Sequence, residues 1–131
     1  MDDLIKDNIE VRTNKEINAL TAKFLGFVTY EEFVKIVEYE FELIKHYNLQ
    51  KCAIDLRLIP VYDEGMPEYV KDVWFPTVSK LGMKYVAFVV PAGTVGKISM
   101  KRAHENTETI AGMTVIHLNE FEDAIEWLKQ Q

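Results

Sequence analysis

The chain has 131 residues, of which 48% are hydrophobic and 27% are charged. This length and composition suit one globular domain over residues 1–131 and leave no room for a second. The formal net charge of −6 has the wrong sign for a protein that binds nucleic acid by neutralising phosphates. The longest apolar stretches, such as 85–91, are far shorter than the roughly 20 residues that a membrane span requires.

The N-terminus is acidic and lacks the basic start and the apolar run of a secretory signal, which predicts a cytoplasmic protein. The single cysteine, Cys52, excludes an internal disulfide framework and a cysteine-based zinc cluster. Because Cys52 begins an apolar segment, we expect it to be a small core residue instead of a reactive thiol.

The first elements are predicted to be two strands. Residues 9–13 alternate apolar and polar side chains, a turn follows at 14–16, and residues 17–25 form the partner strand. The pair predicts an antiparallel hairpin. Its exposed edge makes a homodimer a further expectation, because pairing of two copies would cover that edge.

A helix is predicted to begin at Thr29, since Thr29 and Glu32 form a capping-box pattern. Apolar residues recur at three- and four-residue intervals until the helix ends near residues 47–48. Residues 51–56 then form a mostly apolar strand, which is typical of a central strand covered on both faces. Residues 58–66 carry Pro, Gly and acidic side chains and predict a loop.

The second half alternates helices and strands. A helix from Pro67 to residue 81 is predicted to be kinked or split at Pro76 and stopped by Gly82. A buried strand at 85–90 precedes a helix that starts at Thr94 or Ser99 and ends at about residue 109. A last strand at 113–118 leads to a terminal helix capped by an Asn119-x-x-Glu122 pattern.

This order predicts an α/β fold with a single mixed sheet of about five strands. The N-terminal antiparallel hairpin is followed by three parallel strands, and about four helices flank the sheet through right-handed crossovers.

No catalytic or metal-binding constellation is visible. His46 and His104 are interpreted as helix-surface residues, and His117 lies on a strand without metal-ligand spacing to either. We therefore expect no enzyme activity, no metal and no cofactor. An enzyme that uses Asp55, Asp63 or Glu64 as a base is the least favoured hypothesis.

The segment 91–97 contains Gly93, Thr94, Gly96 and Lys97 between a strand and a helix, which is the position of a phosphate-binding loop. Only two residues separate the glycines and Ile98 follows Lys97, so the pattern departs from a P-loop. A plain turn with a helix start is the simpler interpretation. The exposed backbone amides and Lys97 leave an anion-binding site as the alternative.

Trp74 and Phe75 lie next to Pro76 after an acidic loop. Both rings can be core residues, or the irregular helix can leave one ring lining a groove.

Several segments, read in order, resemble one family over nearly the whole chain. They are 24–29 (FLGFVT), 54–57 (IDLR), 74–76 (WFP), 81–84 (LGMK), 86–91 (VAFVVP) and 124–128 (AIEWL). Their order and spacing are similar to the STAS-like and SpoIIAA-like superfamily, in particular to small bacterial STAS/SEC14-domain proteins.

The resemblance implies a non-enzymatic domain that binds a partner kinase or regulator, switched in one branch by phosphorylation of a serine in an Asp-Ser pair. Asp55-Leu56 matches the family's central strand and Asp63 matches its second aspartate. The next residue is Glu64, so the phosphoacceptor serine is missing. Glu64 carries one charge where a phosphoserine carries about −1.5 to −2. An acidic loop that caps the following helix is the alternative interpretation.

The SEC14 side of the resemblance implies an apolar pocket for a lipid-like molecule, bordered by residues 74–76 and the helix after Gly96. The sequence therefore predicts a protein-interaction or regulatory domain without the phosphoacceptor serine. The alternative is a domain that binds a small apolar or anionic ligand.

Overall fold

The computed structural model describes residues 1–105 and 112–131. These residues form one sheet of six strands in the spatial order β1-β2-β3-β4-β5-β6. The strands are β1 (Leu4–Lys6), β2 (Ile9–Asn14), β3 (Ala19–Phe24), β4 (Lys51–Asp55), β5 (Tyr85–Val89) and β6 (Thr114–Leu118). The helical elements are α1 (Tyr30–Tyr47), α2 (Met66–Tyr69), the π-helical turn η1 (Val70–Trp74), α3 (Phe75–Lys80), α4 (Thr94–Ala103) and α5 (Phe121–Lys129).

The mixed sheet confirms the predicted α/β fold. Strands β1, β2 and β3 are antiparallel neighbours, whereas β3, β4, β5 and β6 are parallel. The prediction of about five strands missed β1, because three residues are too short to show an alternating pattern. β1 pairs with β2 and replaces it as the edge strand of the sheet. The homodimer expected from an exposed edge strand stays a prediction.

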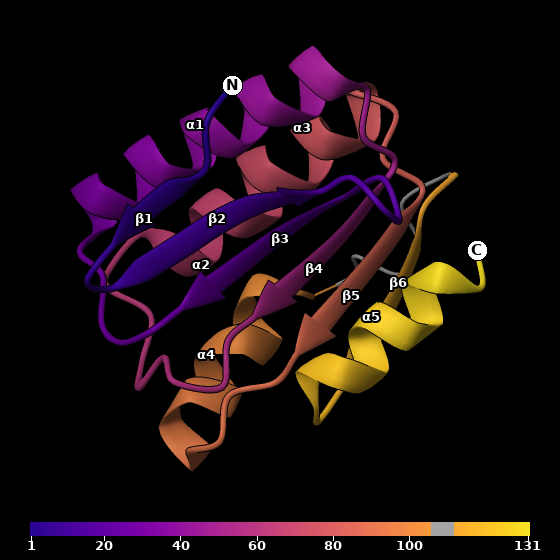
Figure 1. Ribbon diagram of the computed structural model, residues 1–131. Helices are drawn as coiled ribbons and strands as arrows, with labels where there is room; N and C mark the ends of the chain where they lie inside the picture. The colour runs from indigo at the N-terminus through magenta and orange to yellow at the C-terminus, as the bar shows by residue number, and fades with distance from the viewer. Residues whose placement is uncertain (106–111) are drawn as a thin grey trace.

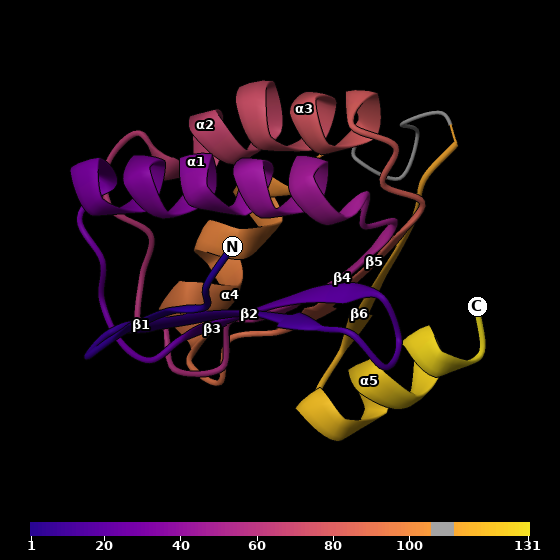
Figure 2. The ribbon, with the colours of Figure 1, turned by 45° about the horizontal axis from the view of Figure 1, so that its top comes forward.

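Helices cover the two faces of the sheet unequally (Figures 1 and 2). Helices α1, α2–η1–α3 and α4 share the larger apolar core with one face, while α5 packs alone on the other face. The alternation of side chains explains the difference. The larger core receives bulky residues such as Leu20 and Phe88, whereas Ala53 and its neighbour Ala87 let Leu128 of α5 approach the sheet.

Helix α1 begins as predicted. The Thr29 hydroxyl accepts a hydrogen bond from the Glu32 amide, and the Glu32 carboxylate accepts one from the Thr29 amide. The helix ends at Asn48 in a left-handed conformation, whose amide donates to the carbonyls of Ile44 and Lys45.

The irregularity expected at Pro76 lies one turn earlier, in η1. A proline lacks an amide hydrogen and its ring presses on the carbonyl four residues before, here that of Asp72. The chain accommodates this by widening, and the Phe75 amide donates to the carbonyl of Val70, five residues back. Gly82 follows in the left-handed conformation, as predicted.

Three predicted boundaries differ from the structure. The strand expected from residue 17 begins at Ala19, because Asn18 has a left-handed backbone that belongs to the turn. The N-cap of α5 is Glu120 instead of Asn119, and its side chain forms no capping hydrogen bond. Helix α4 starts at Thr94, one of the two predicted positions, but ends at Ala103, before the end expected near residue 109, which itself lies outside the described residues.

Within residues 1–105 and 112–131, no helix combines the length and apolar character needed to cross a bilayer.

We predict that Gly96→Ala lowers stability by about 1–3 kcal/mol, because a Cβ at this position overpacks α4 against its neighbours. That Cβ would lie 2.8 Å from the Pro91 Cβ and 2.9 Å from the Ile59 carbonyl oxygen. Urea denaturation measures the effect. Gly26→Ala is the matched control, since nothing lies within 4 Å of its Cβ position, and it should leave stability unchanged or slightly raised. Equal losses in both variants would contradict the packing explanation.

Candidate functional site

The eight residues predicted to form a site lie in three separate places. They are, in chain order, Asp63, Glu64, Trp74, Phe75, Gly93, Thr94, Gly96 and Lys97. The first two line a surface cleft, the next two are buried between the helices and the sheet, and the last four lie at the start of α4.

The surface cleft lies between the start of α1 and the segment that runs from the acidic loop through α2 into η1. Its volume is about 620 Å³. It is lined by Tyr30, Tyr62, Asp63, Glu64, Gly65, Pro67, Glu68, Tyr69, Asp72, Val73 and Arg102. The segment that resembles the family's phosphorylation loop is therefore part of a concave surface.

Asp63 ties the acidic loop to α1. One carboxylate oxygen accepts a hydrogen bond of 2.8 Å from the Tyr30 amide, and the other accepts one of 2.9 Å from the Glu64 amide. The Tyr30 amide belongs to the first turn of α1, where backbone donors need partners from outside the helix. Asp63 thus stabilises the start of α1, whereas the predicted alternative placed the capping role at the helix that follows the loop.

The remaining acidic side chains of the cleft are exposed. Glu64, Glu68 and Asp72 line the cleft together with Arg102, which is the basic residue in the lining. Arg102 already forms an ion pair of 3.0 Å with Glu68. Four carboxylates, counting Asp63, and one arginine leave the cleft with an excess of negative charge.

The lining of the cleft includes two tyrosine rings that pack against each other. Tyr30 and Tyr69 meet edge to face with centroids 6.0 Å apart. Tyr30 lies over Gly65, which has φ +91° and whose Cβ position would be 3.1 Å from the ring. Only a glycine allows both this backbone conformation and this close approach. Burial, followed by the charges of Glu38 and other neighbours, raises the pKa of Tyr69.

The start of α4 is a turn whose Gly93, Thr94 and Lys97 are exposed, while Gly96 is buried. Gly93 is the N-cap and supplies no side-chain hydrogen bond. Gly96 serves the packing of α4 against the loop after β4, as its contacts above show. An anion site at this turn stays a prediction.

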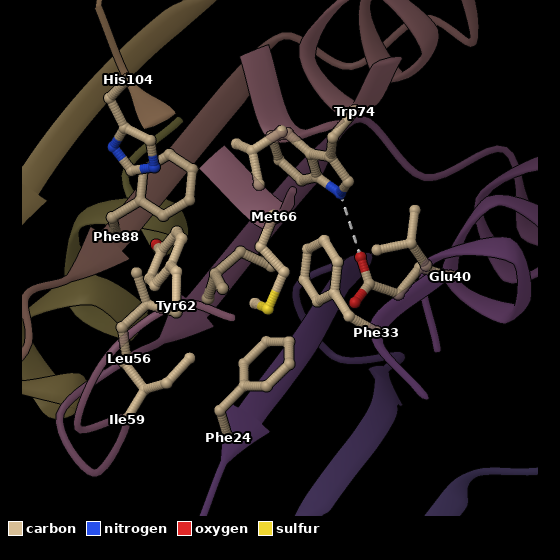
Figure 3. A pocket seen from close by; sticks show the side chains of 13 residues that line it. Phe24, Phe33, Glu40, Leu56, Ile59, Tyr62, Met66, Trp74, Phe88 and His104 are labelled. Carbon is tan, nitrogen blue, oxygen red and sulfur yellow. Dashed lines mark hydrogen bonds between the residues drawn. The ribbon is translucent and has the colours of Figure 1, made fainter. Parts of the chain in front are cut away.

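Next to the cleft, residues of the larger core line a small cavity of about 30 Å³ (Figure 3). Its lining is aromatic and aliphatic except for one carboxyl group and one imidazole. The lining residues are Phe24, Phe33, Val37, Glu40, Ile54, Leu56, Ile59, Tyr62, Met66, Val70, Trp74, Phe88 and His104. Tyr62 also lines the surface cleft, so it forms part of the wall between the two spaces.

Glu40 is the residue that the sequence analysis missed. Its side chain is buried, with 1% of its surface exposed, and Oε1 accepts a hydrogen bond of 3.1 Å from the Trp74 indole Nε1. Burial raises the pKa of the Glu40 carboxyl to about 7, and the Trp74 hydrogen bond opposes this rise. A sequence signal existed, because Glu40 follows Val37 by three residues and precedes Ile44 by four, within the apolar stripe of α1.

Both rings of the predicted aromatic pair are buried, as the core interpretation expected. Trp74 lines the cavity and Phe75 packs edge to face against it at 5.0 Å. The pocket implied by the SEC14 resemblance was expected to be bordered by the helix after Gly96. Trp74 lines this cavity as expected, but that helix does not, and its Lys97 and Met100 line a separate surface pocket instead.

His104 is not a surface residue, in contrast to the prediction. It follows the last turn of α4, is buried against Phe88, and its Nδ1 lies 2.9 Å from Nε2 of His117 on β6. The chain distance of 13 residues concealed this contact, which depends on β6 lying beside β5. Burial, and then the proximity of His117, lowers the pKa of His104 to about 3.

Cys52 is fully buried, and burial raises its pKa well above the usual value, as expected for an unreactive core thiol. Asp55 is held by Arg57 through an ion pair of 2.8 Å, and Arg57 also contacts Glu120. No group of three or more metal-ligand side chains occurs among residues 1–105 and 112–131.

We predict that Glu40→Gln changes the pH dependence of stability. The glutamine oxygen can still accept the hydrogen bond from Trp74, but the substitution removes the titratable carboxyl group. A carboxyl whose pKa rises from 4.5 to about 7 on folding stabilises the fold at acidic pH and loses this effect as pH rises through 7. Relative to the variant, the wild type should therefore lose roughly 2 to 3 kcal/mol between pH 5 and pH 8.

Urea denaturation of both proteins at each pH measures this difference. Comparing the two proteins is necessary because His104 acts in the opposite direction: its lowered pKa removes stability as pH falls below 6.5. A constant difference between wild type and variant across this range would contradict a buried, titrating Glu40.

Solved structures include one that is similar over nearly the whole chain. It is an uncharacterized protein of the DUF3478 family from Shewanella loihica PV-4, described as having a SpoIIAA-like fold. The TM-score is 0.60 with 15% sequence identity, and the match covers 92% of this chain and 91% of that chain. No protein-family model and no curated protein matches the chain. At this identity the likeness shows the fold alone: the 131-residue chain has a SpoIIAA-like fold.

Proposed function

We propose that this protein is a non-enzymatic interaction domain that binds a basic segment of a partner protein in its acidic cleft. The observation that carries the proposal is the composition of the cleft: four carboxylates and three tyrosines line it together with one arginine, which is already paired with Glu68. Complementary charge favours recognition of a basic surface and speeds its association.

The aromatic rings support a peptide instead of a free ion. Tyr30 and Tyr69 offer faces and edges that can pack on the aliphatic part of a lysine or arginine, and a cation near a ring face gains about 0.5–1 kcal/mol at exposed sites. Val73, which is 36% exposed, adds an apolar contact at the same cleft. Tyrosine-rich patches of this kind are common in protein interfaces.

The local structure of the acidic loop supports a constitutive partner site. Asp63 is engaged with the start of α1, and the exposed Glu64 is the residue that the resemblance aligns with the family's phosphoacceptor serine. A permanent carboxylate at this position gives the cleft its charge without phosphorylation. We extend the proposal to a cytoplasmic protein, which fits the single buried thiol.

A lipid-like ligand is less favoured by the geometry. The inner cavity of about 30 Å³ holds about two water molecules, whereas cavities that admit a benzene ring are about 150 Å³. An acyl chain has no room there in this conformation.

Binding of a fluorescent Lys/Arg-rich peptide, measured by anisotropy, tests the proposal. We expect the double variant Glu64→Lys/Asp72→Lys to bind this peptide at least about tenfold more weakly than the wild type, because two reversed charges face the ligand. Both side chains are exposed, so the substitutions should leave the fold intact. An acidic peptide of equal length should bind neither protein.

The matched control is Glu16→Lys/Glu126→Lys, which changes the net charge by the same amount at exposed positions outside the cleft. At about 0.15 M salt, charges more than about 8 Å apart are largely screened, so this variant should bind within about twofold of the wild type. Equal losses in the two double variants would show a response to net charge and would contradict a specific cleft.

A further inference from the structure

The inner cavity is bounded by two helical stripes that face each other. Phe33, Val37 and Glu40 project from α1. Met66, Val70 and Trp74 project from α2 and η1 at intervals of four residues, and the rings of Phe24 and Phe88 close the sheet side (Figure 3).

Among the residues that the structure describes, Glu40 has no cationic partner. Among the described residues, its hydrogen bond from Trp74 is the only polar contact, and no lysine, arginine or histidine forms an ion pair with it. An ionised carboxylate in such a place carries a penalty of several kcal/mol unless a positive charge and further hydrogen bonds compensate it. The second carboxylate oxygen is available for such a bond.

The rest of the lining is suited to the same positive group. Five aromatic rings, those of Phe24, Phe33, Tyr62, Trp74 and Phe88, surround the space. Trp74 and Phe88 have centroids 5.8 Å apart, and Phe24 and Phe33 are 6.0 Å apart. Ring faces within about 6 Å attract an organic cation, and rings arranged around a cavity bind ammonium groups that carry methyl substituents.

We propose that this cavity is a binding site for a small organic ammonium group, which pairs with the Glu40 carboxylate and packs its carbon atoms against the surrounding rings. The inference goes beyond the proposed function, since it concerns a different site. The volume of about 30 Å³ limits the closed form to a group of methylammonium size. Tyr62 lines both the cavity and the cleft.

Four other titratable groups near Glu40 stay neutral between pH 5 and 8. Burial raises the pKa of Cys52 on β4, of Tyr62 in the loop and of Tyr69 on α2, so all three stay neutral. The pKa of His104 beside β5 is lowered to about 3, so it also stays neutral. His117 on β6 contacts His104 and Phe88, so the pH dependence of ammonium binding is assigned to Glu40 by its loss in Glu40→Gln.

Titration with methylammonium chloride at constant ionic strength tests the inference, with the indole N–H resonance of Trp74 as the probe. Trp127, the second tryptophan, lies on α5 across the sheet and serves as an internal control. A ligand with two non-hydrogen atoms binds with a dissociation constant of about 1–10 mM at best, so the titration extends to about 100 mM.

We expect a saturable shift of the Trp74 resonance at pH 8 and none for Trp127. Binding should weaken at least about tenfold at pH 5, where Glu40 is protonated, and by a similar factor in Glu40→Gln. Methanol, which has the same size without the charge, should give no saturable shift. The wild-type measurements alone decide the question if the variant folds poorly. Absence of a saturable Trp74 shift at pH 8, or an equal shift with methanol, would overturn the inference.

Discussion

The structure depends on the burial of β4 and β5 on both faces. Each strand presents bulky side chains to α1, α2–η1–α3 and α4, and small ones such as Ala53 and Ala87 to α5. Period-two alternation means that a register shift of one residue would exchange the two sets and place alanines where the larger core needs volume. The parallel register therefore sets how closely the helices pack on each face of the sheet. The helix positions in turn fix where the cleft and the cavity lie.

The acidic loop after β4 is held by the same constraint. The Asp63 carboxylate reaches the Tyr30 amide because β3 and β4 are parallel neighbours. α1 follows β3 and the acidic loop follows β4, so both begin at the same edge of the sheet. Gly65 then admits the Tyr30 ring. Asp63, which belongs to the segment that resembles a regulatory loop, thus has a structural role. The exposed carboxylates beside it line the cleft.

Glu40 shows the opposite use of a carboxylate. In an apolar core a polar group adds nothing to hydrophobic stabilisation and requires its own hydrogen bonds. The single bond from Trp74 depends on η1, because the wide turn before Pro76 sets the position of the indole relative to α1. The Trp74–Glu40 hydrogen bond therefore depends on Pro76 in one helix and on a carboxyl group in another. Neither segment indicates this contact on its own.

The sequence by itself determined the element order, the mixed sheet, the capping box at Thr29 and the burial of Cys52, because each follows from local periodicity, turn chemistry or composition. It also indicated the acidic loop of the cleft. Only the tertiary structure decided that β1 joins the sheet, that His104 meets His117, and that Glu40 faces Trp74. These contacts join residues that local patterns treat independently, and their geometry arises only when the strands align and the helices pack across them.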